Sequence, residues 1–345
     1  MINHKTIATL FAALSLSFVT MTHAADYIIP SDPNPGTLSN TDTLTLNPTG
    51  VINANLTADN NSQVFISGGN LSAKLTLNDN SSANLSAGSA HEIVATDNSI
   101  LTVTNGTLSN ITLKNFAELN LNGGTIDSNF VTFNNASVNV TAGTFNALYQ
   151  TIDDVQSHIT AGIFNAKLEL KGQSITTIEG GTFHSNVLMR VKANLDVTDG
   201  TFNALLGNSS SNKPLNFSGG TIASTGKLLS TANGSVQVSG GTIDGIIYTT
   251  KKTNFIGSNF TLDGIPIADL SHIPTEITER NNAVLAGILA DGSAFSYTLN
   301  SIIDDASVDY AADDATITVT LIPEPTTAIL LSLSTLPLFT RRSRA

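Results

Sequence analysis

The stretches LNLNGGTID (residues 119–127), VNVTAGTFN (138–146) and LDVTDGTFN (195–203) decide the fold of this chain of 345 residues. In each, two apolar residues that alternate with polar ones precede a glycine, and a small polar residue and an apolar residue follow it. The arrangement recurs at intervals of 18 to 21 residues. The eleven glycines that share it, three of them (Gly50, Gly88 and Gly162) in looser copies, are Gly50, Gly69, Gly88, Gly106, Gly124, Gly143, Gly162, Gly181, Gly200, Gly220 and Gly241. A period this steady indicates an internal structural repeat.

Apolar residues hold three fixed places around each repeated glycine. Those three and five residues before it alternate with polar residues, which is typical of a strand with one buried face. The second set, two residues after the glycine, comprises Leu108, Ile126, Phe145, Phe164, Phe183, Phe202, Ile222 and Ile243. The third set, about six residues after it, includes Leu75, Phe130, Leu168, Val187, Leu206 and Ile247. Polar turns such as NDNSS at 78–82 follow, so each repeat predicts three short strands.

Repeats of this kind predict an all-β, single-stranded parallel β-helix, or β-solenoid, with about 19 residues per rung. No repeat could bury its apolar residues alone, whereas stacking turns each set into a continuous stripe inside the coil. At about 4.8 Å per rung, eleven rungs would form a rod about 50 Å long. A β-sandwich is the alternative, and the long fixed period favours the solenoid. We therefore expect Phe145, Phe164, Phe183 and Phe202 to lie directly above one another.

The period divides the chain into segments. Residues 25–43 form a proline-containing lead-in, residues 44–256 the solenoid of about 11 rungs, and residues 257–322 a C-terminal β cap. In the cap, VLAGILADGSAFSYTL (284–299) predicts a hairpin that turns at Asp291 and Gly292. DATITVTLIP (314–323) predicts one more strand. A cap is expected because the end of a solenoid otherwise exposes unpaired backbone groups.

Composition limits the classes of function. Charged residues make up 12% of the chain and its formal net charge is −12, so no basic surface is expected and nucleic-acid binding is not predicted. The absence of cysteine excludes disulfides and cysteine-based metal or redox sites. Outward columns of threonine and asparagine, among them Thr144, Thr182, Asn146 and Asn165, are expected along the rod. They would solvate the strands, and they are also compatible with carbohydrate binding.

Candidate catalytic groups show no recurring arrangement. Carboxylates that could serve polysaccharide cleavage are Asp153, Asp154, Glu179, Asp196 and Asp199. Lys167, Lys171, Arg190 and Lys192 stand near them in sequence without a shared register. We therefore expect no enzyme, and a secreted polysaccharide lyase or hydrolase is the alternative.

No metal site or cofactor is predicted. The histidines, including His91, His158 and His184, lack metal-ligand spacing. The acidic run of Asp304, Asp305, Asp309, Asp313 and Asp314 is compatible with weak Ca²⁺ binding but lacks the EF-hand spacing. Solvated loops are the simpler interpretation.

The N-terminus has the pattern of a secretory signal peptide, residues 1–24. Lys5 precedes the apolar stretch IATLFAALSLSFV (7–19), and Thr22 and Ala24 fit the −3 and −1 positions of a cleavage site after Ala24. An N-terminal anchor helix is the alternative, but the stretch is short for a membrane span.

The C-terminus, PEPTTAILLSLSTLPLFTRRSRA (323–345), joins a short acidic turn, an apolar run and an arginine cluster. It resembles the PEP-CTERM sorting signal in Pro323, Glu324 and Pro325, in the apolar helix, and in Arg341, Arg342 and Arg344. This resemblance implies transient membrane insertion and removal of the tail by an exosortase. Pro337 and the short run depart from a stable membrane helix. We expect short helices only in the signal peptide and in this C-terminal tail.

The rungs also resemble those of haemagglutinin-type β-helical adhesins, and that resemblance implies a right-handed coil. Together the two resemblances imply an exported structural or adhesive protein of the cell surface or extracellular matrix. Its expected partners are the exosortase and an exopolysaccharide.

Overall fold

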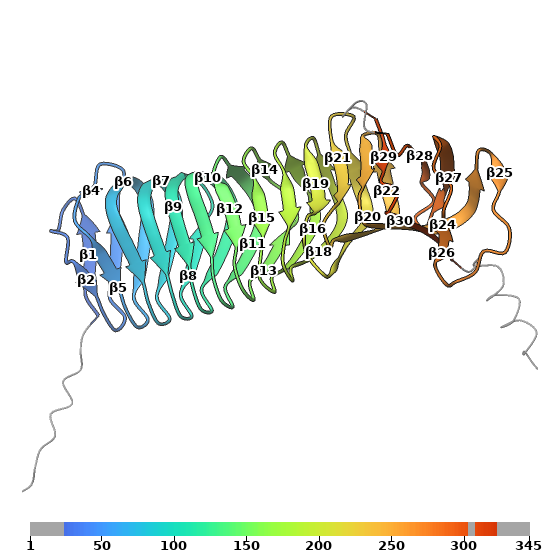
Figure 1. Ribbon diagram of the computed structural model, residues 1–345. Coiled ribbons are helices and arrows are strands. Elements are labelled where there is room, and N and C mark those ends of the chain that lie inside the picture. Colours follow the sequence, from blue (N-terminus) through green and yellow to red (C-terminus); the bar gives the residue numbers. More distant parts are fainter. Residues whose placement is uncertain (1–23, 303–307, 323–345) are drawn as a thin grey trace, which may run out of the picture.

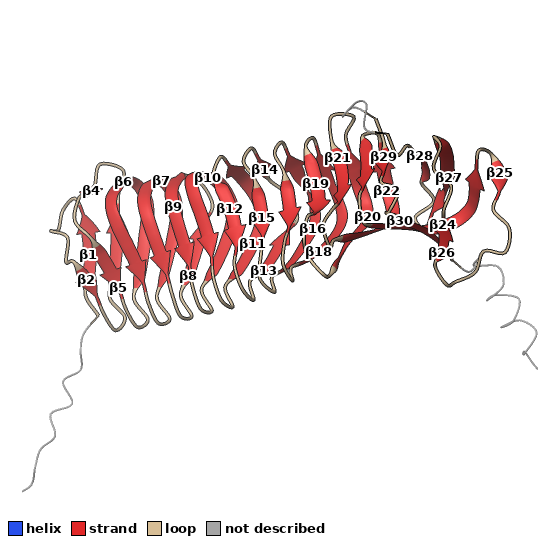
Figure 2. Ribbon diagram, in the orientation of Figure 1, coloured by secondary structure: helices blue, strands red, loops and turns tan. Residues whose placement is uncertain are grey.

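The computed structural model describes residues 24–302 and 308–322, which form an elongated all-β rod (Figure 1). The strands form a parallel β-solenoid of about 12 turns with bridges about 19 residues apart, and the described part has no helix (Figure 2). The predicted fold class is therefore confirmed. The terminal helices that the sequence predicts lie outside the described residues.

Each turn has three faces, and long strands bend through the first corner from one face to the next. The first face, with the apolar residues that precede the repeated glycine, contains β1 (Asp26–Ile29), β3 (Thr43–Leu46), β6 (Gln63–Leu77), β7 (Ser82–Ala95), β8 (Ile100–Val103), β10 (Glu118–Thr132), β11 (Ser137–Phe145), β13 (Gln156–Ile159), β16 (Ile175–Phe183), β18 (Asn194–Phe202), β20 (Pro214–Ile222), β22 (Ser235–Ile243), β24 (Lys252–Leu262) and β30 (Thr316–Leu321).

The other two faces follow the glycine. The separate strands of the second face are β4 (Val51–Ile52), β9 (Thr107–Leu113), which continues into the third face, and β14 (Ile163–Phe164). The third face contains β2 (Thr37–Leu38), β5 (Leu56–Ala58), β12 (Leu148–Thr151), β15 (Leu168–Leu170), β17 (Val187–Met189), β19 (Leu205–Asn208), β21 (Lys227–Ser230), β23 (Ile246–Thr249) and β29 (Tyr310–Ala311).

The repeated glycine forms the first corner because this place admits no side chain. Gly124 has φ 78°, a left-handed conformation that only glycine adopts without strain. A Cβ at Gly124 would also lie 2.7 Å from the carbonyl oxygen of Gly106, the corner glycine of the preceding turn. Conformation and close stacking thus both explain the glycine repeat.

Short polar residues form the corner between the third face of each turn and the first face of the next, which we call the second corner. Left-handed backbone recurs once per turn at Asn40, Asn60, Asp79, Asp97, Asn115, Asn134, Asp153, Gly172 and Val191. Asparagine and aspartate tolerate this conformation better than other residues with a Cβ. The backbone conformation therefore explains the polar residues of these turns, and Val191 and Ala232 (φ 53°) depart from the pattern.

The core is a set of continuous columns. Leu119 pairs with Val138 and Leu121 with Val140 in parallel register, and all four are buried. On the second face the ring centroids of Phe145, Phe164, Phe183 and Phe202 follow at 4.5, 4.6 and 4.9 Å, with nearly parallel planes. The predicted aromatic stack is confirmed, because parallel rungs repeat each side chain at the rung spacing.

The lead-in and cap complete the two ends. In the lead-in, β1 pairs in parallel with β3, so the coil is already formed there, and the turns number about 12 rather than the 11 glycine copies. In the cap, β29 pairs in parallel with β23, and β30 with β24. The remaining cap strands are β25 (Ile265–Pro266), β26 (Thr275–Ile277), β27 (Ala283–Leu289) and β28 (Ala294–Leu299). The predicted hairpin is β27–β28, with Gly292 at φ 92°.

Candidate functional site

The residues predicted for processing lie mostly outside the described part of the chain. These are Thr22, Pro323, Glu324, Pro325, Arg341, Arg342 and Arg344. Ala24, the last residue of the predicted signal peptide, is the first described residue. The next residue is held firmly, because the backbone N–H of Ala25 donates to Asp42 Oδ1 at 2.9 Å. Across residues 24–302 and 308–322, no helix has the length and apolar character that a membrane crossing requires.

The carboxylates that we considered for catalysis each bond to different partners. Asp196 accepts hydrogen bonds from the side chains of Asn194 at 3.2 Å and Asn216 at 2.6 Å. Asp199 accepts from the backbone N–H of Gly200 at 2.7 Å. Glu179 lies 3.0 Å from His158 Nε2. Within the described residues, no group of three or more histidine, aspartate or glutamate side chains could hold a metal ion.

The predicted asparagine column is present at the turn between the second and third faces. Asn146 donates to Asp127 Oδ1 at 2.9 Å, and Asn165 donates to Asn146 Oδ1 at 2.8 Å. Further along, the side chains of Asn203 and His184 are 3.2 Å apart. These amides bond to one another from rung to rung, which satisfies part of their hydrogen-bonding capacity within the rod.

A groove of about 780 Å³ follows the second corner across successive turns, and we call it the corner groove. Its lining residues are Asp97, Asn98, Asn115, Phe116, Asn134, Asn135, Asp153, Asp154, Gly172, Gln173, Val191 and Lys192. They come as pairs from consecutive turns, each pair a left-handed residue and the residue after it. The groove therefore runs along the rod and repeats its chemistry at the rung spacing.

Hydrogen bonds between turns fix the polar side chains of the corner groove. Asn115 donates to Asp97 Oδ1 at 2.9 Å, and Asn134 donates to Asn115 Oδ1 at 3.0 Å. Gln173 likewise donates to Asp154 Oδ1 at 2.9 Å. Each amide still has a second N–H, and the carbonyl and carboxylate oxygens have further lone pairs. The groove thus offers ordered donors and acceptors in rows.

Phe116 gives the corner groove an exposed aromatic ring. The side chain is 62% exposed, whereas the same place in the neighbouring turns is held by Asn98 and Asn135. Phe116 was not among the residues that the sequence predicts for a site. Its signal was available, because one phenylalanine interrupts a turn position that is otherwise polar. An aromatic face beside fixed polar groups is a usual feature of a ligand site.

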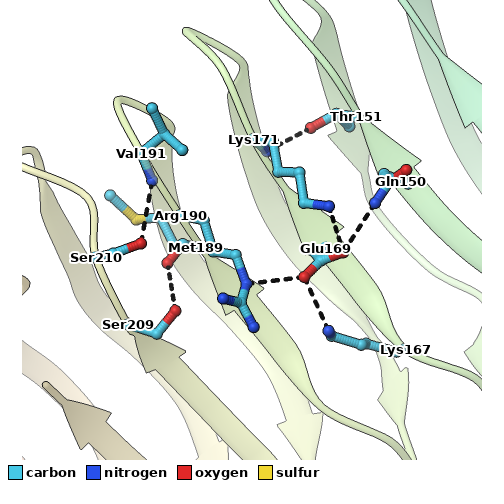
Figure 3. A network of polar contacts seen from close by, with 10 residues as sticks. All are labelled: Gln150, Thr151, Lys167, Glu169, Lys171, Met189, Arg190, Val191, Ser209 and Ser210. Atoms are coloured by element: carbon cyan, nitrogen blue, oxygen red, sulfur yellow. Dashed lines mark hydrogen bonds and ion pairs between the residues drawn. The ribbon is translucent and has the colours of Figure 1, made fainter. Parts of the chain in front are cut away.

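A charge cluster lies on the third face, centred on Glu169 of β15 (Figure 3). Lys167 Nζ lies 2.9 Å from Oε1 and Lys171 Nζ lies 2.8 Å from Oε2. From the next turn, Arg190 Nε lies 2.8 Å from Oε1. Gln150, one turn before, donates to Oε2 at 2.8 Å. We call Lys167, Glu169, Lys171 and Arg190 the Glu169 cluster.

The interpretation that Lys167, Lys171 and Arg190 share no arrangement was wrong, whereas Lys192 stays outside the cluster. Lys167 and Lys171 flank Glu169 on one short segment, and the parallel register brings Arg190 beside it from the following turn. Glu169 itself was not singled out, although a glutamate between two strand leucines is unusual in this chain.

The cations determine the charge state of the glutamate. Burial by itself would raise the pKa of Glu169, but hydrogen bonds from Lys171, Lys167 and Gln150 and the charge of Lys167 outweigh it. They lower the pKa to about 2 from an ordinary 4.5. Glu169 is therefore ionised at neutral pH and is unsuited to act as a general acid.

The corner groove and the Glu169 cluster are neighbours along the chain. Lys171 precedes Gly172 and Gln173, and Arg190 precedes Val191 and Lys192, all four of which line the groove. One side of the rod therefore presents the aromatic ring of Phe116, rows of amide and carboxylate side chains, and the three cations of the Glu169 cluster.

Comparisons with known proteins identify no relative. No protein-family model matches the chain, and neither the curated proteins nor the solved structures contain a significant match.

Proposed function

We propose that this protein is an exported structural or adhesive rod that binds a polysaccharide of the cell surface or extracellular matrix. The observation that supports the proposal most is the corner groove, which repeats polar side chains over successive turns and places Phe116 among them. A linear polymer can follow such a groove, because both have a repeating structure along one axis.

The chemistry of the lining suits sugar and disfavours nucleic acid. Sugar hydroxyls both donate and accept hydrogen bonds, which suits the mixed amide and carboxylate side chains of Asn98, Asn135 and Asp154. An apolar face of a sugar ring can pack on an exposed aromatic ring such as Phe116. Nucleic acid would meet the carboxylates of Asp97, Asp153 and Asp154, which repel phosphate.

Binding through the corner groove is tested with Phe116→Ala. Intact protein would be run in affinity electrophoresis through gels that contain a panel of neutral and acidic polysaccharides. We expect retardation by at least one polysaccharide, and a loss of about tenfold in affinity in the variant, since burial of an exposed phenylalanine side chain contributes about 1.5–3 kcal/mol. The matched control is Phe65→Ala, because Phe65 is 39% exposed on the first face, away from the groove.

Two results would contradict the binding proposal. One is retention of full affinity in Phe116→Ala. The other is release of unsaturated or reducing ends from the polysaccharide, with loss of that activity on changing Asp196 or Asp199. That result would support the polysaccharide lyase or hydrolase instead.

Export and sorting belong to the same proposal, and they rest on the sequence resemblance. We propose that the chain is inserted transiently in the membrane and that an exosortase removes the tail at the Pro323, Glu324 and Pro325 motif. Glu324→Ala should leave a larger product in the membrane fraction, detected by fractionation and by mass spectrometry of the C-terminus. Normal release of that variant would contradict the role of Glu324.

A further inference from the structure

We propose that the Glu169 cluster is an anion site that recognises the carboxylate groups of an acidic polysaccharide. This inference deepens the proposed function, on which it rests, by naming the chemical class of the ligand. It assigns binding to Lys167, Lys171 and Arg190, with Glu169 as the residue that positions them.

The carboxylate of Glu169 is already surrounded by side chains of the protein. Oε1 is contacted by Lys167 and Arg190, and Oε2 by Lys171 and Gln150, at distances of 2.8 to 2.9 Å. A carboxylate has about four lone-pair sites, and Lys167, Lys171 and Gln150 take three of them, while Arg190 Nε lies against Oε1 without donating a hydrogen bond to it. Its side chain is only 9% exposed. Glu169 therefore holds the cations in place beneath the surface and offers nothing further to a ligand.

The cations themselves keep donors that face outward. The side chains of Lys167, Lys171 and Arg190 are 32%, 34% and 40% exposed. Each ammonium has three N–H donors and the guanidinium has five. The ion pair of Arg190 with Glu169 is made through Nε, which is one of the three nitrogens of the guanidinium. Donors remain available at the surface on three side chains held close together.

One donor in the cluster is buried without a hydrogen bond. Arg190 Nε lies close to Oε1 as an ion pair, but its N–H is not directed at any acceptor in the described part of the chain. A buried donor of this kind costs free energy. A small rotation of the guanidinium toward a bound anion would let both edges of the group form bonds, in the bidentate manner that suits carboxylates.

Charge balance also favours an external anion. Three cations and one carboxylate leave the cluster with a surplus of two positive charges, in a chain whose net charge is −12. One cation would be enough to compensate Glu169. An arrangement in which three cations crowd one carboxylate gains stability when a second anion binds beside it.

The surroundings restrict how the ligand approaches. Asp153 and Asp154 line the adjacent corner groove and would repel an anion on that side. In the next turn Leu188, which is 8% exposed, pairs with Glu169, so an apolar side chain lies on that side of the carboxylate. The carboxylate of an acidic sugar would thus contact the cluster from the third face, on the side away from these aspartates.

The test measures the affinity of the intact protein for three polymers: polygalacturonate, dextran sulfate and neutral dextran. We expect Arg190→Gln and Lys171→Gln each to weaken binding of polygalacturonate about fivefold or more, and to leave binding of neutral dextran unchanged. Lys74→Gln is the matched control, because it removes the same charge from the third face several turns away. Circular dichroism confirms that each variant is folded, and Lys167→Gln replaces any variant that is not.

The three polymers separate the possible outcomes. Equal weakening by Lys74→Gln and Arg190→Gln would overturn the inference, because binding would then reflect overall charge. Tight binding of dextran sulfate alone would overturn the assignment to carboxylates. Loss of polygalacturonate binding in Phe116→Ala but not in Arg190→Gln would overturn the anion site and leave the proposed function standing. The reverse pattern would support the anion site and contradict the corner groove.

Discussion

At the scale of the residue, the second corner shows how backbone conformation selects the side chain. Its left-handed position is held by asparagine, aspartate or glycine in most turns, by Val191 with φ 59° in one, and by Ala232 with φ 53° in another. A β-branched side chain in this conformation clashes with its own backbone. Val191 is also 54% exposed, so it gains little from burial.

Val191→Asn should therefore stabilise the protein. We expect the free energy of unfolding to rise by about 1 kcal/mol, because left-handed backbone costs roughly 1–2 kcal/mol for residues with a bulky Cβ. Thermal unfolding followed by circular dichroism would measure the change. The converse variant Asn60→Val places valine in the same conformation, at φ 59°, and should be destabilised by a similar amount. A lower melting temperature for Val191→Asn would contradict this account.

Glu169 gives a second prediction at this scale, on pH. Its pKa is lowered to about 2 in the folded protein, so its contribution to stability is complete above its ordinary value of 4.5. The contribution is lost as pH falls from about 4.5 towards 2. Its upper limit is about 3 kcal/mol, and screening of the half-exposed cations reduces it.

The measurement compares the wild-type protein with Glu169→Gln at pH 7 and at pH 3. We expect the wild type to be the more stable at pH 7 and the difference to shrink at pH 3. Carboxylates common to both proteins cancel in this comparison. A difference that does not depend on pH would show that Glu169 does not stabilise the fold through its charge.

At the scale of the element, the aromatic stack joins four consecutive turns. Phe164 of β14 lies between Phe145 and Phe183, with ring centroids 4.5 and 4.6 Å away, and is 1% exposed. Backbone pairing on the second face is short here, because β14 has only two residues, and both pair with the turns on either side. The rings therefore supply much of the cohesion that backbone pairing cannot.

Phe164→Ala should destabilise these turns strongly. Loss of a buried phenylalanine costs about 3–5 kcal/mol, and the stacking on both sides is lost as well. Because turns of a solenoid unfold semi-independently, we expect faster hydrogen exchange first in β11, β14 and β16. Phe116→Ala is the control, since its exposed ring should change stability by no more than about 0.5 kcal/mol. Unchanged exchange in these strands would contradict the stack as a source of stability.

At the scale of the whole molecule, the cap covers the unpaired strand edges with which a solenoid would otherwise end. The last complete turn would expose the edges of β23 and β24, and the cap pairs β29 and β30 with them. Side chains fix the cap in place: Asp291 Oδ2 accepts from the backbone N–H of Gly241 at 2.6 Å, and Asp309 Oδ1 from that of Ile247 at 2.8 Å. The cap thus ends the parallel pairing that would otherwise accept another chain.

Removal of the residues after Leu262 should cause self-association. The uncovered edge of β24 presents unpaired backbone groups, so the truncated protein is expected to form concentration-dependent oligomers in sedimentation velocity, unlike the intact chain under the same conditions. A truncated protein that also carries Asn254→Lys places a charge on that edge and should associate less. Identical sedimentation of truncated and intact protein would show that the cap has another purpose.

Much of the fold could be predicted from the sequence, and the candidate site could not. The glycine period, the three apolar sets and the Phe145 to Phe202 stack follow from local rules, because a parallel coil repeats each position at a fixed spacing. The cap hairpin follows from the Asp291 and Gly292 turn in the same way.

The sequence by itself therefore determined the period of the coil, the direction of each core residue and the place of each corner. Only the tertiary structure decided which outward side chains meet. Glu169 and Arg190 are 21 residues apart, and their contact depends on register between turns and on side-chain conformation, neither of which the period fixes. The corner groove likewise exists only once residues of successive turns lie side by side. The physical reason is that burial constrains inward residues strongly, whereas outward residues interact only through the geometry that stacking creates.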